Sequence, residues 1–234
     1  MKNHISRADS LTNQVMTHVR AAVADGSMSS GEWYSVYQLS QELGVSRSPV
    51  RDALLRLEEA GLITFARNRG FQIRETTAAD VAEIFAIRLA LEPAAARRAA
   101  ELRTEAHVNT LQTLLDDMSM QASNKNAEAF FNLDQAFHGE ILSAGSSLRS
   151  REIIDRLRIS TRLIGVSTAG TSRTLEDIHR EHEPIFLAIE AQYKEGAAEA
   201  MRAHLQTTGK LLLQQASPEM DAQQVSSFWA QYTD

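Results

Sequence analysis

Four side chains in the C-terminal part of the chain have the chemistry of metal ligands. Asp134 and His138 are four residues apart, so on a helix both would point the same way. His182 and His204 lie in two later stretches that also have helical spacing. A carboxylate and several imidazoles can bind zinc, nickel or manganese. A lone histidine is more often a surface or core residue, and an Asp–His pair at this spacing is often only a hydrogen bond, so both interpretations stay open.

Apolar residues at helical spacing accompany all four of these groups. They are Phe137, Ile141, Ile185, Ile189, Met201 and Leu205. The pattern predicts that the four polar groups lie in or beside a helical core, where unpaired polar atoms are costly. Other histidines lack apolar neighbours on both sides and are interpreted as ordinary: His4, His18, His107 and His179.

A second group of residues could read DNA. In the predicted helix that Ser46 caps, Arg47 and Arg51 share one face with Ser48 near the N-terminal end. Arginine can bind O6 and N7 of guanine together, and serine hydroxyls at a helix N-terminus suit phosphate oxygens. An amphipathic helix with arginines on its wet face is usually only a solvated helix. We prefer that interpretation for Arg56, which lies far from the helix start.

A basic hairpin follows this helix. Arg67, Asn68 and Arg69 fall at the tip of the hairpin, in a predicted turn that runs to Gly70 and joins two short strands over 62–66 and 71–73. Such a wing can reach the minor groove or the DNA backbone. Together with Arg47 and Arg51, these residues favour DNA contact over a merely solvated surface.

The surrounding pattern predicts a winged helix-turn-helix in residues 1–75. Leu11, Val15 and Val19 have helical spacing over 10–24, and a short helix is expected around Val36–Leu43. The next helix runs to about residue 60, with an apolar stripe that faces its neighbours. The stripe consists of Val50, Ala53, Leu54 and Leu57.

Residues 76–234 read as an all-helical domain, so the fold class is mainly α. Helices are expected near 78–101, 105–122, 126–144, 147–165, 173–193 and 195–216. Six helices joined by short loops predict an antiparallel bundle. Pro93 and Pro184 should kink two of them or mark irregular turns. Near the C-terminus, Phe228 and Trp229 could dock a short final helix.

Composition narrows the function classes. The 234 residues are 43% apolar and 23% charged, which is ordinary for a globular protein. The absence of cysteine excludes disulfides, thiolate zinc sites and cysteine nucleophiles. There is no apolar run of about 18 residues and no secretory signal, so a cytoplasmic protein without a membrane partner is expected.

The charge is distributed unevenly along the chain. The net charge is −6 overall. Residues 1–75 carry nine basic and eight acidic residues, a net of +1, which leaves −7 for the remainder. Residues 46–74 contain six arginines but only three acidic residues. A basic stripe in an acidic protein is typical of a DNA-binding domain joined to a neutral or acidic partner domain.

The run from Gly44 to Leu54, with Leu57, Gly61–Ile63 and Arg69–Phe71, resembles the signature of GntR-family regulators. The resemblance covers about residues 10–75 and implies operator contacts by Arg47, Ser48, Arg51 and the wing glycine, Gly70. Family members often have a Glu-Arg pair before the helix-turn-helix, and its arginine contacts DNA. Here Val36 and Tyr37 stand at those positions. With the residues singled out above, the predicted DNA-binding set is Ser46, Arg47, Ser48, Arg51, Arg67, Asn68, Arg69 and Gly70.

Residues 78–216 are similar to the effector domain of the FadR subgroup, the FCD domain, in its shorter, VanR-like form of six helices. The resemblance implies that Asp134, His138, His182 and His204 hold a divalent metal ion at the bundle centre. Zinc is the first choice, with nickel and manganese as alternatives. The asparagine that the family often has after the metal helix is missing from 144–147.

The run over 84–93 looks like the first helix of that domain, in which an arginine faces the cavity and pairs with a carboxylate of the effector. Arg88 stands at that position, and its planar fork suits a carboxylate. The alternative is a surface ion pair of Arg88 with Glu92 or Glu83. Arg158 and Arg162 are weaker candidates, on a helix expected to line the cavity.

The leading hypothesis is a homodimeric transcription regulator that binds double-stranded operator DNA and is controlled by a small organic acid. An alternative is a metal-dependent hydrolase or lyase fused to a DNA-binding head. An enzyme is disfavoured because no carboxylate in these motifs is placed as a general base. A third hypothesis is a structural metal in a dimerisation domain that senses nothing.

Overall fold

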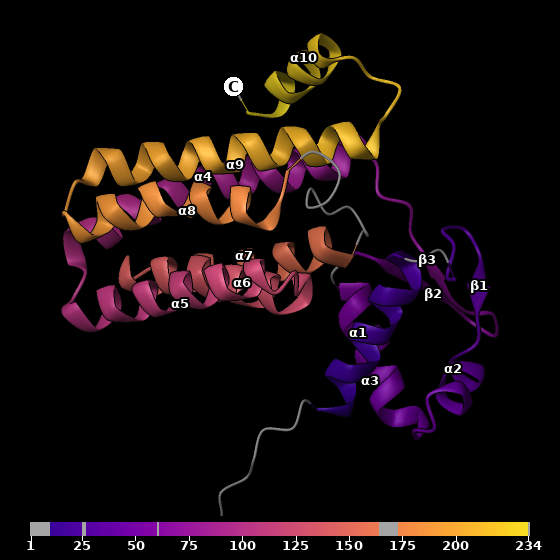
Figure 1. Cartoon of the computed structure of the whole chain (residues 1–234). Helices are drawn as coiled ribbons and strands as arrows, with labels where there is room; N and C mark the ends of the chain where they lie inside the picture. The colour runs from indigo at the N-terminus through magenta and orange to yellow at the C-terminus, as the bar shows by residue number, and fades with distance from the viewer. Residues whose placement is uncertain (1–9, 25–26, 60, 164–172, 234) are drawn as a thin grey trace, which may run out of the picture. The chain divides into compact units, whose positions relative to one another are not determined.

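The computed structural model describes residues 10–24, 27–59, 61–163 and 173–233. Two compact units make up the chain, and along the sequence the second begins at Thr77. The last part of α7, from Ile159, groups with the first unit. The fold is mainly helical, as predicted (Figure 1).

The first unit is a small helical domain with a three-stranded sheet. Its elements are α1 (Leu11–Ala24), β1 (Trp33–Tyr34), α2 (Val36–Glu42), α3 (Arg47–Glu59), β2 (Ile63–Ala66) and β3 (Gly70–Ile73). The predicted apolar stripe of α3 is fully buried. It packs in one core with Val15 and Val19 of α1 and with Phe71 of β3. This core leaves the polar face of α3 free to be presented outward.

The sheet has the order β1–β3–β2, and both pairs of strands are antiparallel. The sequence predicted β2 and β3 but not β1, because two residues are too few to show an alternating pattern. Gly70 has a φ of +95°, and a β-carbon there would lie 2.0 Å from the carbonyl oxygen of Tyr34. Glycine is therefore what lets β3 approach β1 this closely.

The second unit consists of longer helices. They are α4 (Ala78–Leu102), α5 (Glu105–Ser123), α6 (Ala127–Ala144), α7 (Leu148–Leu163, of which this unit includes the part up to Arg158), α8 (Leu175–Glu190), α9 (Lys194–Ala216) and α10 (Ala222–Thr233). Capping boxes, in which a threonine and a residue three positions later bond to each other's backbone N–H groups, begin α4, α5 and α8. His107 is the second member of the box at α5, which gives this histidine a local structural role.

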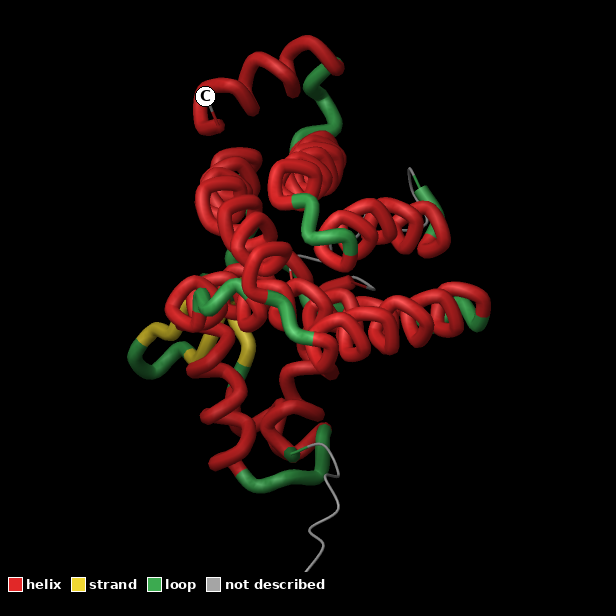
Figure 2. Tube along the Cα trace, turned by 90° about the vertical axis from the view of Figure 1, so that its left-hand side faces the viewer, coloured by secondary structure: helices red, strands yellow, loops and turns green. Residues whose placement is uncertain are grey.

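The helices of the bundle pack in a way that brings distant segments together. α4 lies along α9, α8 packs on both α9 and α5, and α6 packs on α4 and α5 (Figures 1 and 2). Ile154 of α7 packs with Ala95 of α4 and Leu142 of α6. Pro93 and Pro184 lie inside α4 and α8, and neither proline ends its helix. None of the described helices combines the length and apolar character needed to cross a membrane.

α10 is the final helix that the sequence suggested. It packs on α4 and α9, on the side of that pair away from α5 and α6 (Figure 1). Trp229 is buried at 3% exposure, as expected of a docking residue. Phe228 is only partly buried and packs on Tyr232, with ring centroids 5.3 Å apart.

Candidate functional site

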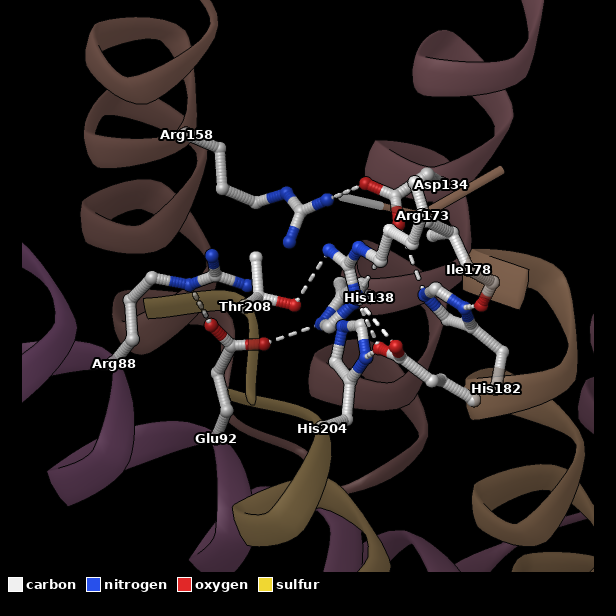
Figure 3. Close-up of polar contacts among 11 residues, drawn as sticks. Arg88, Glu92, Asp134, His138, Arg158, Arg173, Ile178, His182, His204 and Thr208 are labelled. Carbon is white, nitrogen blue, oxygen red and sulfur yellow. Dashed lines mark hydrogen bonds and ion pairs between the residues drawn. The ribbon is translucent and has the colours of Figure 1, made fainter. Parts of the chain in front are cut away.

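The four predicted metal ligands lie together inside the helical bundle. α6 contributes Asp134 and His138, α8 contributes His182 and α9 contributes His204 (Figure 3). All four are buried, and each offers one ligand atom such that these atoms lie within 4.8 Å of one another. Residues up to 70 positions apart in the sequence therefore meet at one point.

The hydrogen bonds of His182 show which of its nitrogens carries the proton. Its Nδ1 lies 2.7 Å from the carbonyl oxygen of Ile178, and because a carbonyl can only accept, Nδ1 is the donor. Burial, reinforced by the neighbouring His138, lowers the pKa of His182 well below its ordinary value, so the ring is neutral. Its Nε2 therefore has a lone pair, and this atom lies 2.9 Å from Oδ1 of Asp134.

His138 is oriented by a carboxylate. Its Nδ1 lies 2.5 Å from Oε2 of Glu92, on α4. Burial opposes ionisation of Glu92, but the guanidinium of Arg88 and the ring of His138 outweigh it and hold the pKa of this carboxyl well below its usual range. The ionised carboxylate accepts a hydrogen bond from the Nδ1–H group of His138. The Nε2 atom of His138 is buried and has no hydrogen-bond partner among the described residues.

His204 follows the same pattern. Its Nδ1 lies 3.0 Å from Oε2 of Glu181, which accepts the hydrogen bond. Burial and the nearby rings of His182 and His138 lower the pKa of His204 well below its ordinary value, so this ring is also neutral. Glu181 is held in turn by Arg173, which also donates to Thr208 over 3.0 Å.

The three imidazoles thus turn their Nδ1 protons outward and leave Nε2 for the centre of the cluster. Histidines that bind metals show this arrangement, because a hydrogen bond from the outer nitrogen fixes the ring and its tautomer. Three imidazole nitrogens and one carboxylate oxygen form a donor set suited to zinc and related divalent ions. The chemistry and the orientation of these four side chains therefore fit a divalent metal ion.

Asp134 also has a positive partner. Its Oδ2 forms a buried ion pair with Nη2 of Arg158, on α7. Arg158, a weaker candidate in the sequence, therefore lies beside the cluster. The side chain of Arg162, the other weaker candidate, lies outside the described residues.

Arg88 lies on α4, on the side that faces the cluster (Figure 3). It is 3% exposed, and its Nε donates to Oε1 of Glu92 over 2.6 Å. Its guanidinium stacks 4.8 Å from the ring centre of Phe85. The expected alternative, a surface pair with Glu92, is wrong in its placement: the pair forms, but it is buried. Nη2 of Arg88 has no hydrogen-bond partner among the described residues.

The sequence did not indicate the residues that orient the histidines. Glu92, Glu181 and Arg173 each contact a ligand or a residue that holds one (Figure 3). Glu92 lies between the apolar residues Leu91 and Pro93, which is a weak signal of burial. Glu181 directly precedes His182, but nothing in this spacing shows that it would reach across to α9.

The predicted DNA-reading residues at the start of α3 are presented outward. Ser46, Arg47, Ser48 and Arg51 are exposed. Neither arginine forms an ion pair with a described acidic residue. The guanidinium of Arg47 stacks on the ring of Tyr37, 4.7 Å from its centre.

The wing presents a similar surface. Arg67, Asn68 and Arg69 are exposed. Asn68 has a φ of 64°, which fits a tight turn between β2 and β3. Arg69 stacks on Trp33 of β1, 4.6 Å from its ring centre. Gly70 begins β3 instead of lying in the turn.

Two family patterns match the chain. The pattern of bacterial regulatory proteins of the gntR family matches residues 11–73, and that of the FCD domain matches residues 83–207. Together they cover both units.

Curated relatives and solved structures agree with these matches. The transcriptional regulator LutR of Bacillus subtilis is 32% identical over 195 residues, which is 73% of this chain and 86% of LutR. The transcriptional repressor RspR of Escherichia coli is 27% identical over 206 residues, covering 88% and 90%. The structure of McbR/YncC from E. coli superimposes with a TM-score of 0.71 at 26% identity, covering 88% of this chain and 99% of that one.

The names of the family and of these relatives point to transcription regulators and not to enzymes. The alternative of a metal-dependent hydrolase or lyase finds no support among them. The chain belongs to the GntR family of bacterial transcription regulators and has the FCD domain of that family as its C-terminal part.

Proposed function

We propose that this regulator holds a divalent metal ion in its FCD domain and that a small carboxylate effector binds beside the metal. The observation that carries the proposal is the 2.9 Å contact between Nε2 of His182 and Oδ1 of Asp134. Both atoms present lone pairs, because the single proton of His182 is donated to Ile178. A cation between the histidines and Asp134 would turn this repulsion into attraction.

The donor set favours zinc, with nickel or manganese as alternatives. Asp134, His138, His182 and His204 would be the protein ligands. A bound ion supplies a Lewis acid that can take a carboxylate oxygen as a further ligand. The carboxylates of Glu92 and Glu181 increase the electron density of His138 and His204 through their hydrogen bonds, which strengthens both as ligands.

Arg88 is the proposed second contact for the effector. Its guanidinium is buried beside the cluster, and its Nη2 has a proton to donate and no acceptor among the described residues. A buried donor without a partner is costly, and a carboxylate is the acceptor that a guanidinium binds best. An acid that bridges the metal and Arg88 would satisfy both groups.

The proposed DNA surface combines α3 with the wing in residues 1–75, and residues 76–234 bind the effector and dimerise. Arg47 and Arg51 would read bases, whereas Ser46 and Ser48 would bind phosphates. Arg67, Asn68, Arg69 and Gly70 would follow the adjacent backbone or minor groove. A homodimer in the cytoplasm would bind two half-sites of double-stranded operator DNA, and the effector would act by differing in affinity for the DNA-competent and incompetent states.

Metal analysis of the full-length protein purified without chelator tests the proposal. We expect about one divalent ion per chain in the wild type, because the four proposed ligand atoms meet at a single point. His182→Ala should lower it well below one. His179→Ala is the matched control, because His179 lies on the same helix but outside the cluster. Equal metal content in the two variants would contradict the metal site.

Thermal unfolding of metal-loaded protein with a panel of two- to six-carbon mono- and dicarboxylic acids tests the effector. A ligand stabilises the state that binds it by mass action. Arg88→Lys should abolish stabilisation by any acid that stabilises the wild type. If no acid stabilises the metal-loaded wild type, the carboxylate part of the proposal is wrong and the metal is structural.

A further inference from the structure

The C-terminal helix α10 lies beyond the residues that match the FCD domain, which end at 207. Its apolar face is small, with Val225 and Trp229 as its buried residues. Trp229 is nevertheless among the largest side chains of the chain and is 3% exposed. Trp229 is therefore the larger of the two buried side chains on the face of α10 that packs on the bundle.

The ring of Trp229 packs against Phe85 of α4 and Gly209 of α9. Its ring centre is 5.9 Å from that of Phe85, which is fully buried. At Gly209 of α9, a β-carbon would lie 2.1 Å from Cη2 of Trp229 and 2.8 Å from Cδ1 of Phe85. Because both contacts are too short for real atoms, the absence of a side chain at Gly209 is what lets the two rings pack together.

Phe85 connects this aromatic contact to the effector site. Its ring carries the guanidinium of Arg88 at 4.8 Å on α4. Arg88 donates to Glu92, and Glu92 accepts from His138. Direct contacts thus run from α10 through one aromatic ring and one ion pair to a proposed metal ligand.

We infer that Trp229 is a positioning residue for effector recognition: it fixes the ring of Phe85, and that ring holds the guanidinium of Arg88 toward the carboxylate site. The inference rests on the proposed function for the identity of the ligand. Its physical basis is that Arg88 is held by few groups. Glu92 holds Nε and the face of Phe85 supports the plane of the guanidinium, while Nη2 has no described partner. If Phe85 moved, the guanidinium of Arg88 would therefore no longer be held in one orientation.

Nuclear magnetic resonance of the full-length protein, labelled with ¹⁵N-arginine and free of metal and carboxylate, tests the inference. The Nε–H group of Arg88, identified through Arg88→Lys, should give a signal protected from hydrogen exchange because it is buried and bonded to Glu92. Trp229→Leu and Gly209→Ala should both abolish this protection. Trp229→Phe should retain part of the protection, since an aromatic ring remains against Phe85.

Phe228→Leu is the matched control, because Phe228 lies on the same helix but packs on Tyr232. This variant should keep the protected signal of Arg88. If Phe228→Leu and Trp229→Leu affect the signal equally, α10 is only a structural element and the inference is overturned. If Trp229→Leu keeps the protection, the inference is overturned as well.

A measurement on the wild type covers the case in which the variants fail to fold. In low concentrations of urea, the Nε–H of Arg88 should begin to exchange under the same conditions as the backbone amides of α10. Continued protection of Arg88 while α10 exchanges would overturn the inference. Since neither metal nor acid is present, these results are independent of the proposed function, whose failure would appear as an absence of metal or of stabilisation by acids.

Discussion

Nε2 of His182 and Oδ1 of Asp134 lie 2.9 Å apart with no proton between them. The other oxygen of the same carboxylate, Oδ2, forms an ion pair with Arg158. Asp134 thus lies between an arginine and three histidines. Its charge is satisfied by Arg158, whereas the buried Nε2 atoms of His138 and His182 have no hydrogen-bond partner among the described residues.

Glu181→Gln should weaken metal binding although Glu181 is not a proposed ligand. The neutral amide accepts more weakly from Nδ1 of His204, and residues in this role typically change metal affinity by about tenfold to a hundredfold. Competition with a fluorescent zinc chelator measures the affinity. Glu183→Gln, on the exposed side of the same helix, is the control and should match the wild type. Equal affinities for all three proteins would show that Glu181 does not support the site.

Glu92→Gln should destabilise the metal-free protein strongly. The change leaves Arg88 as a buried charge without its ionic partner, and breaking such a pair costs roughly 3–5 kcal/mol. Urea unfolding followed by circular dichroism gives the free energy of unfolding. Glu101→Gln, which breaks an exposed pair with Lys194, should have little effect. A small effect of Glu92→Gln would mean that the buried pair is readily replaced.

Arg51→Ala should reduce binding to a specific DNA site more than binding to random DNA. Loss of a bidentate contact with a base costs about 1–3 kcal/mol, whereas loss of a phosphate contact weakens both kinds of binding alike. Fluorescence anisotropy with a site selected by the wild-type protein measures both affinities at one salt concentration. Arg56→Ala, on the C-terminal part of α3, is the control and should bind nearly as the wild type does. Equal losses on the two DNAs would assign Arg51 to phosphate.

Tyr37→Leu should lower operator affinity through Arg47. The ring of Tyr37 supports the guanidinium, and an exposed contact of this kind contributes about 0.5–1 kcal/mol, or a factor of about two to five. The same anisotropy assay applies. Tyr37→Phe keeps the ring and should keep the affinity. A loss in Tyr37→Phe as large as in Tyr37→Leu would show that the hydroxyl group matters instead.

Asp177→Asn should lower stability at neutral pH but not in acid. Hydrogen bonds from the backbone and side chain of Thr174 hold the pKa of Asp177 below its ordinary value of 3.8. A depressed pKa in the folded state means that the stabilisation is fully present above 3.8 and is lost as the pH falls through the folded value. Urea unfolding between pH 6 and pH 3 should therefore show a gap between variant and wild type that narrows toward acid. A gap independent of pH would contradict the role of the charge.

The helices could be predicted because their apolar residues repeat with the helical period, as in Val50, Ala53, Leu54 and Leu57, all of which are buried. The same reasoning places Asp134 and His138 on one face of one helix. It does not say which helices become neighbours. The meeting of these two residues with His182 and His204 was expected from family resemblance, not from spacing.

The burial of charged residues was harder to predict from the sequence than the helices were. Arg88 and Glu92 have the spacing of an ordinary surface pair, and only tertiary packing makes it a buried one. β1 was missed because its two residues are held by pairing with β3 and not by any pattern of their own. Both cases depend on contacts between segments far apart in the chain.

The close approach of β3 to β1 at Gly70 affects how genetic data on the wing should be interpreted. Any side chain at this position would collide with the backbone at Tyr34 and push the two strands apart. Mutations of Gly70 that abolish repression or activation would then reflect a misfolded hairpin, even if the glycine also touches the operator. Only substitutions at the neighbouring Arg67 and Arg69, which are free of this steric conflict, can separate recognition from folding.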